Sequence, residues 1–305
     1  MGPAIGVVAV TIGGALLYRT LSAYEWPQIV EAVAAIPRQS VAGGIAFAML
    51  SYFCLTWFDW LGLRYVGQPL CYRRAALASF TSLSIGHNIG FAGLSSGAIR
   101  YRFYKRWGLG LADVAKLVVF CGLTVGLGLS TVAGMALVIS PDLASRFIGF
   151  SDSSFVAIGV SMLALVASYL ALSGMTSSRL RVGRWSIDVP SPKLALAQVI
   201  IGSLNFMFVA ACLHQLILAG ADIGYFEVAG AYVVSNIASI LSHVPGGVGV
   251  LETVLTILLP GAHLIGVLVM FRVIYFLIPL TLGLLLLVFS EFLSDQPRSE
   301  PRAKP

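Results

Sequence analysis

Residues 242–253 read SHVPGGVGVLET, and this stretch decides the fold. It places a proline, three glycines, a histidine and a glutamate within twelve residues, between two long apolar segments. Proline and consecutive glycines end an α-helix. A broken helix leaves backbone N–H and C=O groups without partners. The surroundings of this stretch therefore determine what the break can do.

The composition identifies those surroundings as a membrane. Of the 305 residues, 58% are hydrophobic and 10% are charged, whereas about a quarter of a soluble domain is charged. Each long apolar segment has close to or more than the roughly 20 residues that cross the hydrocarbon of a bilayer. These segments lie at about 3–22, 41–63, 115–140, 155–173, 194–220 and 263–291. We therefore expect an all-α polytopic membrane protein with about six full spans.

Two further apolar segments, about 75–99 and 225–260, are interrupted by glycine and polar residues. The loops that flank the first, 64–74 and 100–116, both carry several Lys and Arg. Such loops are cytoplasmic by the positive-inside rule, so 75–99 must enter and leave the membrane from one side. With this topology, 15 of the 19 Lys and Arg residues are cytoplasmic. The interrupted segments are thus expected to be broken re-entrant helical hairpins, and both chain termini are expected to be cytoplasmic.

The same order of segments occurs twice along the chain. Span, span, hairpin, span describes about 3–140 and again about 155–291. The first half starts inside and the second starts outside, so the repeats are inverted. Paired broken segments in inverted repeats mark the substrate site of many transporters. We expect a single transmembrane domain over 1–293 and a short cytoplasmic tail at 294–305.

The break holds residues that are expected to contact a substrate. A half-helix that starts near Gly249 presents free N–H groups and partial positive charge, which suit a phosphate, and a matching terminus is expected near Gly93–Gly97. Glu252 either caps its first turn or receives a cationic headgroup. Arg272 lies inside the last span, where a charge needs a partner. Glu252 is the acidic candidate, either as a structural ion pair or as part of a substrate site.

Arg100 follows a run of small residues and is expected to draw anionic headgroups toward the site. Nearby Arg102 is expected to be an ordinary positive-inside anchor, and Asp59 is expected to pair with Arg64. For the histidines and asparagines at the breaks, an interhelical hydrogen bond is the alternative to a substrate contact. The full expected set is Arg100, His87, Asn88, Gly97, Asn236, His243, Pro245, Gly246, Gly247, Gly249, Glu252 and Arg272.

Two runs resemble a known family. SHVPGGVGVLETV at 242–254 and GHNIGFAGLSSGAIRYRFY at 86–104 resemble the lysylphosphatidylglycerol synthase transmembrane (UPF0104) family. They are similar to the N-terminal flippase domain of the multiple peptide resistance factor. The resemblance implies a bacterial inner-membrane protein that moves phospholipid, in the best-known members aminoacylated phosphatidylglycerol, to the outer leaflet. Only about 14 residues follow the last span, so we expect no transferase domain and do not carry over the synthase activity.

A phospholipid flippase or translocase, with the headgroup held at the broken-helix termini, is therefore the expected function. The alternative is a lipid-binding membrane partner of a separately encoded lipid-modifying enzyme. An intramembrane enzyme is disfavoured because no nucleophile–base pair or ligand cluster appears at helical spacing, and no cofactor or metal is expected. Cytoplasmic loops account for the net charge of +6, so we expect no nucleic-acid partner. The sequence leaves open whether the protein forms a homo-oligomer.

Overall fold

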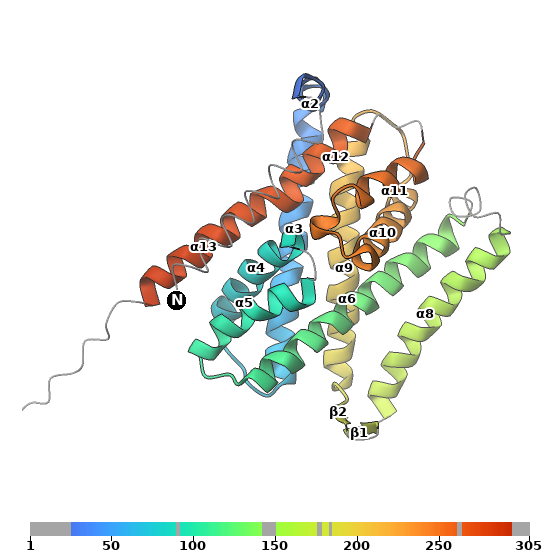
Figure 1. Ribbon diagram of the computed structural model, residues 1–305. Coiled ribbons are helices and arrows are strands. Elements are labelled where there is room, and N and C mark those ends of the chain that lie inside the picture. The colour runs from blue at the N-terminus through green and yellow to red at the C-terminus, as the bar shows by residue number, and fades with distance from the viewer. Residues whose placement is uncertain are drawn as a thin grey trace, which may run out of the picture.

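The computed structural model describes residues 26–89, 92–141, 151–175, 179–182, 185–260 and 264–294 (Figure 1). Five helices in these ranges are long and apolar enough to cross a membrane: Arg38–Tyr65 (α3), Leu111–Ile139 (α6), Asp152–Met175 (α8), Pro192–Ile217 (α9) and Leu264–Phe292. They coincide with five of the six expected spans, and the chain is an all-α polytopic membrane protein. The sixth expected span, at 3–22, and the tail from residue 295 onward lie outside the described residues.

The hairpins form where the sequence interrupts its apolar segments. The first consists of α4 (Tyr72–Ile89) and α5 (Ala92–Arg106), and the second of α10 (Tyr225–Ser242), the short 3-10 turn η1 (Pro245–Gly247) and α11 (Val250–Leu258). At 1.5 Å per residue, α4 is about 27 Å long and α11 about 14 Å, compared with the roughly 30 Å of hydrocarbon in a bilayer. The first hairpin starts beside the end of α3 and returns to the start of α6, at one end of the molecule (Figure 1).

The two halves of the chain pack reciprocally. Helix α4 packs against α13 (Ile278–Ser294), in the last span of the second half, and α10 packs against α6, the last span of the first half. Helices α3 and α9, which hold equivalent places in the two halves, pack along each other. The inverted repeat expected from the sequence predicts such an exchange.

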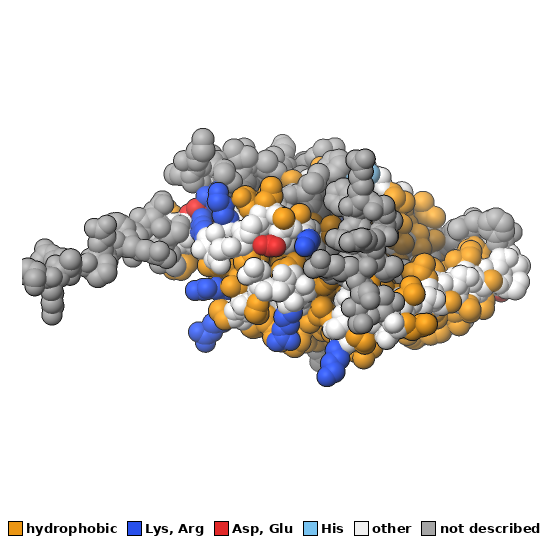
Figure 2. Space-filling view, turned by 90° about the horizontal axis from the view of Figure 1, so that it is seen from below, with side chains coloured by type: hydrophobic (Ala, Val, Ile, Leu, Met, Phe, Trp, Pro, Cys, Tyr) orange, Lys and Arg blue, Asp and Glu red, His pale blue; other side chains and the backbone are white. Residues whose placement is uncertain are grey.

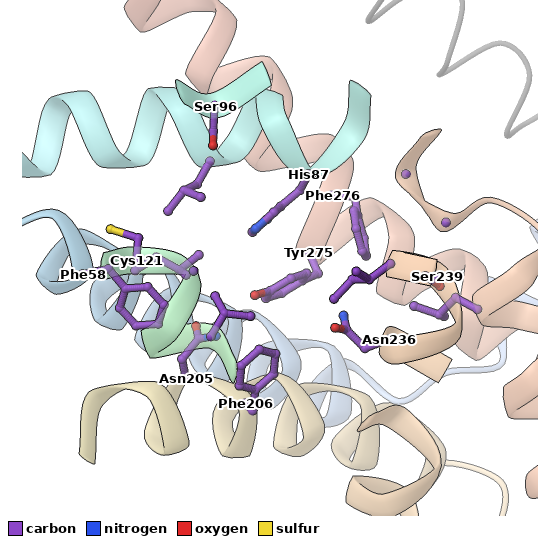
Figure 3. Close-up of a pocket in the computed structure, with 18 of the residues that line it drawn as sticks. Phe58, His87, Ser96, Cys121, Asn205, Phe206, Asn236, Ser239, Tyr275 and Phe276 are labelled. Carbon is purple, nitrogen blue, oxygen red and sulfur yellow. The ribbon is translucent and has the colours of Figure 1, made fainter. Parts of the chain in front are cut away.

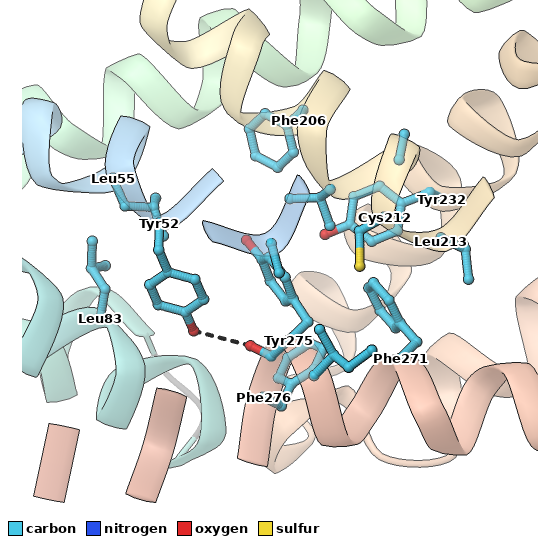
Figure 4. Packing of buried hydrophobic residues seen from close by; sticks show 14 of the residues in the cluster. Tyr52, Leu55, Leu83, Phe206, Cys212, Leu213, Tyr232, Phe271, Tyr275 and Phe276 are labelled. Carbon is cyan, nitrogen blue, oxygen red and sulfur yellow. Dashed lines mark hydrogen bonds between the residues drawn. The ribbon is translucent and has the colours of Figure 1, made fainter. Parts of the chain in front are cut away.

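The last span contains a π-helical segment, η2 (Val273–Leu277), between α12 (Leu264–Arg272) and α13. Pro279 follows it, and proline cannot donate a backbone hydrogen bond to the carbonyl four residues earlier. That carbonyl belongs to Tyr275, and it accepts a hydrogen bond from the Tyr52 hydroxyl at 3.1 Å instead (Figure 4). The side-chain amide of Asn88 donates to the next carbonyl, Phe276, at 3.4 Å. Side chains from the first half therefore donate to two carbonyls of the last span, and the proline leaves one of them, that of Tyr275, without its helical donor.

Charge and apolarity are distributed as a membrane requires. Lys and Arg gather at the end of the molecule where α3 ends and α6 and α9 begin (Figure 2). Large apolar side chains are exposed on the outward helix faces, for example Val119 at 72% and Leu165 at 62%. At the basic end, α8 connects to α9 through a two-stranded antiparallel hairpin, β1 (Arg179–Val182) and β2 (Trp185–Asp188). This hairpin was not expected from the sequence.

Small residues allow the spans to approach closely. A Cβ atom added to Gly128 on α6 would lie 2.4 Å from the carbonyl group of Gly202 on α9, and one added to Gly202 would lie 2.5 Å from the carbonyl oxygen of Thr124. Gly134 on α6 and Gly159 on α8 meet in the same way. Membrane helices use such contacts because no hydrophobic effect drives them together in lipid.

Gly202→Ala should therefore lower the free energy of unfolding by about 1–3 kcal/mol, because the added methyl group overpacks the crossing of α6 and α9. Gly126→Ala is the matched control, since nothing lies within 4 Å of its Cβ position. Alanine there should be neutral or raise stability by up to about 1 kcal/mol through helix propensity. Thermal unfolding of both variants in detergent makes the comparison. Equal midpoints would contradict the close crossing.

Candidate functional site

A cavity of about 530 Å³ lies between the two broken hairpins (Figure 3). Its volume is in the range of small-molecule and cofactor sites. Ser96 and His87 reach it from the first hairpin, Asn236 and Ser239 from α10, and Asn205 from α9. Apolar and aromatic side chains form most of the remaining wall, among them Leu55, Phe58, Leu83, Val118, Phe206 and Phe276. The cavity is thus amphipathic and is built by both halves of the chain.

The structure brings half of the expected substrate-binding residues to this cavity. His87, Arg100, Asn236, His243, Gly246 and Gly247 line it. The other expected residues, Asn88, Gly97, Pro245, Gly249, Glu252 and Arg272, are not part of the lining. Their contacts show that they shape the hairpins around the cavity.

The break in the second hairpin explains its glycines. The backbone has positive φ at His243 (55°), Gly246 (62°), Gly247 (59°) and Gly249 (84°), a region that favours glycine. A Cβ atom at Gly247 would also lie 2.7 Å from the hydroxyl oxygen of Ser239. The sequence PGGVG therefore makes a tight turn whose three glycines adopt positive φ, and this turn forms part of the cavity wall.

Arg272 holds the turn together. Its Nε donates to Oε1 of Glu252 at 2.5 Å, and its Nη2 donates to Oε2 of Glu252 and to the carbonyl oxygen of Gly247, each at 3.0 Å. Its Nη1 donates to the carbonyl oxygen of Gly246. The expected pairing of Arg272 with Glu252 is therefore present. The guanidinium group binds the unwound backbone as well as the carboxylate.

Glu252 also caps the half-helix that follows the break. Its Oε2 accepts a hydrogen bond from the backbone N–H of Gly249 at 2.9 Å, which is the glutamate half of a capping box. The N-terminus of α11, which was expected to hold a phosphate, is thus already occupied by a carboxylate of the chain itself. At the first hairpin, α5 starts at Ala92, and Gly97 lies within the helix, where an added Cβ would contact Val118 at 3.5 Å. Gly97 therefore faces α6 from within the helix.

Arg100 lines the cavity with its charge compensated from behind. Its Nε contacts both carboxylate oxygens of Asp59, at 3.1 and 3.0 Å, and its Nη2 donates to Oδ1 at 2.7 Å. Its Nη1 donates to the hydroxyl of Ser96 at 2.8 Å. Asp59 also accepts hydrogen bonds from the Tyr104 hydroxyl at 2.7 Å and from the Cys121 thiol at 3.7 Å. Both members of the ion pair are buried, at 2% and 0% side-chain exposure.

This pairing corrects the expectation that Asp59 pairs with Arg64. The guanidinium group of Arg64 lies 3.5 Å above the ring of Trp60, which is a cation–π contact. Arg102, expected to be an anchor, forms an ion pair with Glu291 near the end of α13. Hydrogen bonds also account for two of the amides at the breaks. Asn88 bridges α4 to the last span, and Asn236 donates to the Tyr232 hydroxyl at 3.2 Å.

Sequence reasoning missed Asn205 and Tyr275, which lie in the middle of apolar spans and line the cavity. The Ser51 hydroxyl joins them: it donates to Oδ1 of Asn205 at 2.7 Å and lies 2.9 Å from the Tyr275 hydroxyl. The sequence feature that could have identified Asn205 is that it is the single asparagine in the span at 194–220. Polar residues inside membrane segments usually face the protein interior or a polar cavity.

Arg272→Met should destabilise the fold by about 3–5 kcal/mol, because it leaves a partly buried carboxylate and two backbone carbonyls unpaired. Arg102→Met is the matched control, since Arg102 and Glu291 are 23% and 21% exposed, and exposed pairs contribute about 0–1 kcal/mol. Glu252→Gln should cost less than Arg272→Met, because glutamine also completes a capping box. Thermal unfolding in detergent tests this order. Equal losses of stability for Arg272→Met and Arg102→Met would show that Arg272 does not hold the turn together.

Comparisons with known proteins place the chain among membrane proteins. No protein-family model matches it. It is 31% identical over 305 residues to the uncharacterized protein slr0712 of Synechocystis, covering 99% of this chain and 94% of that protein. It is 28% identical over 289 residues to inner membrane protein YbhN of Escherichia coli, covering 92% and 89% of the two chains. Neither name mentions lysylphosphatidylglycerol. The chain belongs to the same family as slr0712, and it is similar to YbhN, an inner membrane protein of the UPF0104 family.

Proposed function

We propose that this multi-pass inner-membrane protein moves phospholipid between the leaflets of the bilayer. The observation that carries the proposal is the cavity that the two broken hairpins form together, one hairpin from each half of the chain. In transporters with inverted repeats, the halves rock around a site at their interface. A cavity between two such hairpins is therefore in the right place to be exposed to each side in turn.

The lining suits a lipid better than a wholly polar solute. One part of the wall carries Ser96, Arg100 and His87, and much of the rest is aliphatic or aromatic. Gly122 on α6 and Ile240 on α10 belong to the lining, are exposed, and lie in a cavity that is open to the surface. The cavity thus reaches the surface beside these two helices. A headgroup can occupy the polar part while the acyl chains stay in the membrane.

The proposed orientation places the basic end of the molecule, and both chain termini, in the cytoplasm. We propose a transport function for this protein and no enzymatic activity. Aminoacylated phosphatidylglycerol is the substrate that the family resemblance suggests. A separately encoded lipid-modifying enzyme and a second copy of this chain are the partners to look for.

Two glycines on α6 give a matched test. Nothing lies within 4 Å of the Cβ position of either Gly122 or Gly126, but only Gly122 is part of the cavity lining. Gly122→Leu should narrow the cavity without disturbing the helix, because leucine has a higher helix propensity than glycine. In liposomes that contain a fluorescent phospholipid, wild type and Gly126→Leu should expose inner-leaflet probe to a membrane-impermeant quencher, and Gly122→Leu should match protein-free liposomes.

The same preparations separate the alternative function. If wild type retains lipid through purification and moves none, and Gly122→Leu retains none, the protein is a lipid-binding partner of another enzyme. If Gly122→Leu and Gly126→Leu move lipid equally well, the cavity is not the route. Thermal unfolding of both variants checks that each is folded.

A further inference from the structure

We infer that the cavity selects a phospholipid whose headgroup is zwitterionic, with a phosphate and an ammonium group and no net charge. This inference rests on the proposed function and specifies its substrate class. It follows from the balance of charge around the cavity and from the hydrogen-bonding groups left open to it.

The cavity wall is electrically neutral. In the part of the chain that the structure describes, Arg100 is the one Lys, Arg, Asp or Glu residue of the lining, and Asp59 compensates its charge from behind at 2.7 Å. The other titratable side chains of the lining are His87, His243, Cys121 and the tyrosines. A charge without a counter-ion is costly to hold in a desolvated site. A headgroup with net charge of either sign is therefore disfavoured.

The Arg100 side still offers donors for a phosphate. A guanidinium group has five N–H hydrogens, and the bonds to Asp59 and Ser96 engage one each on Nε, Nη1 and Nη2. No described residue accepts a hydrogen bond from the two that remain. Because Arg100 lines the cavity, these two donors are available to phosphate oxygens. Arginine with a free N–H pair binds phosphate well.

The opposite wall offers acceptors for an ammonium group. Asn236 uses its amide nitrogen to donate to Tyr232, which leaves its amide oxygen for a donor in the cavity, and Asn236 and Tyr275 both point into the cavity (Figure 3). Aromatic rings in the lining, such as Phe206 and Tyr232, attract cations over their faces. The carboxylate of Glu252, expected from the sequence to receive the cation, is held by Arg272 and lies outside the lining.

Among the described residues, this wall offers neutral acceptors and no carboxylate. The positive charge of a bound ammonium group is therefore balanced only by the phosphate of the same lipid. A phosphate without an amine leaves one negative charge in the cavity. A lipid with one phosphate and two amines, such as lysylphosphatidylglycerol, leaves one positive charge. Phosphatidylethanolamine leaves none.

The test uses native mass spectrometry of purified full-length protein in neutral detergent at pH 8. Phosphatidylethanolamine and phosphatidylglycerol with identical acyl chains are supplied at equal concentration. Wild type should retain phosphatidylethanolamine over phosphatidylglycerol by about tenfold or more, since an unbalanced charge in such a site costs at least that ratio. Gly122→Leu should retain neither, which assigns the bound lipid to the cavity.

A charge change checks the cause of the preference. Asn236→Asp keeps the shape of the side chain and adds one negative charge to the lining, so the preferred lipid should become one with net positive charge, lysylphosphatidylglycerol. Gln215→Glu is the matched control, because Gln215 lies on α9 outside the lining. It should keep the wild-type preference.

Wild type that retains phosphatidylglycerol as well as phosphatidylethanolamine overturns the inference and leaves the proposed function in place. So does an Asn236→Asp variant that folds and keeps the wild-type preference. Wild type that retains neither lipid overturns the proposed function and this inference together.

Discussion

Lipid cannot hydrogen-bond to the peptide groups of an unwound chain, and this constraint shapes the centre of the molecule. The turn at Pro245–Gly247 exposes the carbonyl oxygens of Gly246 and Gly247, and Arg272 donates to both. Glu252 neutralises Arg272 and also caps the helix that follows. One guanidinium group thus makes the break possible. Without the break, the second hairpin could not form part of the cavity wall.

The two buried arginines have different tasks. Arg272 donates hydrogen bonds to the turn and to Glu252, and it lies outside the cavity lining. Arg100 is bound to Asp59 and Ser96 and faces the cavity. The first arginine therefore fixes the shape of the cavity, and the second sets its electrostatic character. Both depend on a carboxylate partner, as buried charges generally do.

The sequence predicts the fold well because membrane folding follows simple rules. Apolar length located the described spans, and glycine and proline located the breaks. The pair Arg272–Glu252 was predictable because a charge inside a span needs a partner and Glu252 was the best-placed acidic residue. The pair Arg100–Asp59 was not, because it joins two helices that come together only through packing. Asn205 and Tyr275 were missed for the same reason: the side of a span that faces a cavity depends on its neighbours.

The sidedness of the first hairpin tests the account most directly. Cys71, before α4, is exposed, and Cys54, Cys121 and Cys212 are buried. A membrane-impermeant maleimide should label Cys71, and Lys105→Cys in a Cys71→Ser background, in inverted membrane vesicles and not in spheroplasts. Asp222→Cys in the same background should label in spheroplasts only. If Cys71 and Lys105→Cys label from opposite sides, α4 and α5 cross the membrane once, and the account of two re-entrant hairpins around a lipid cavity is wrong.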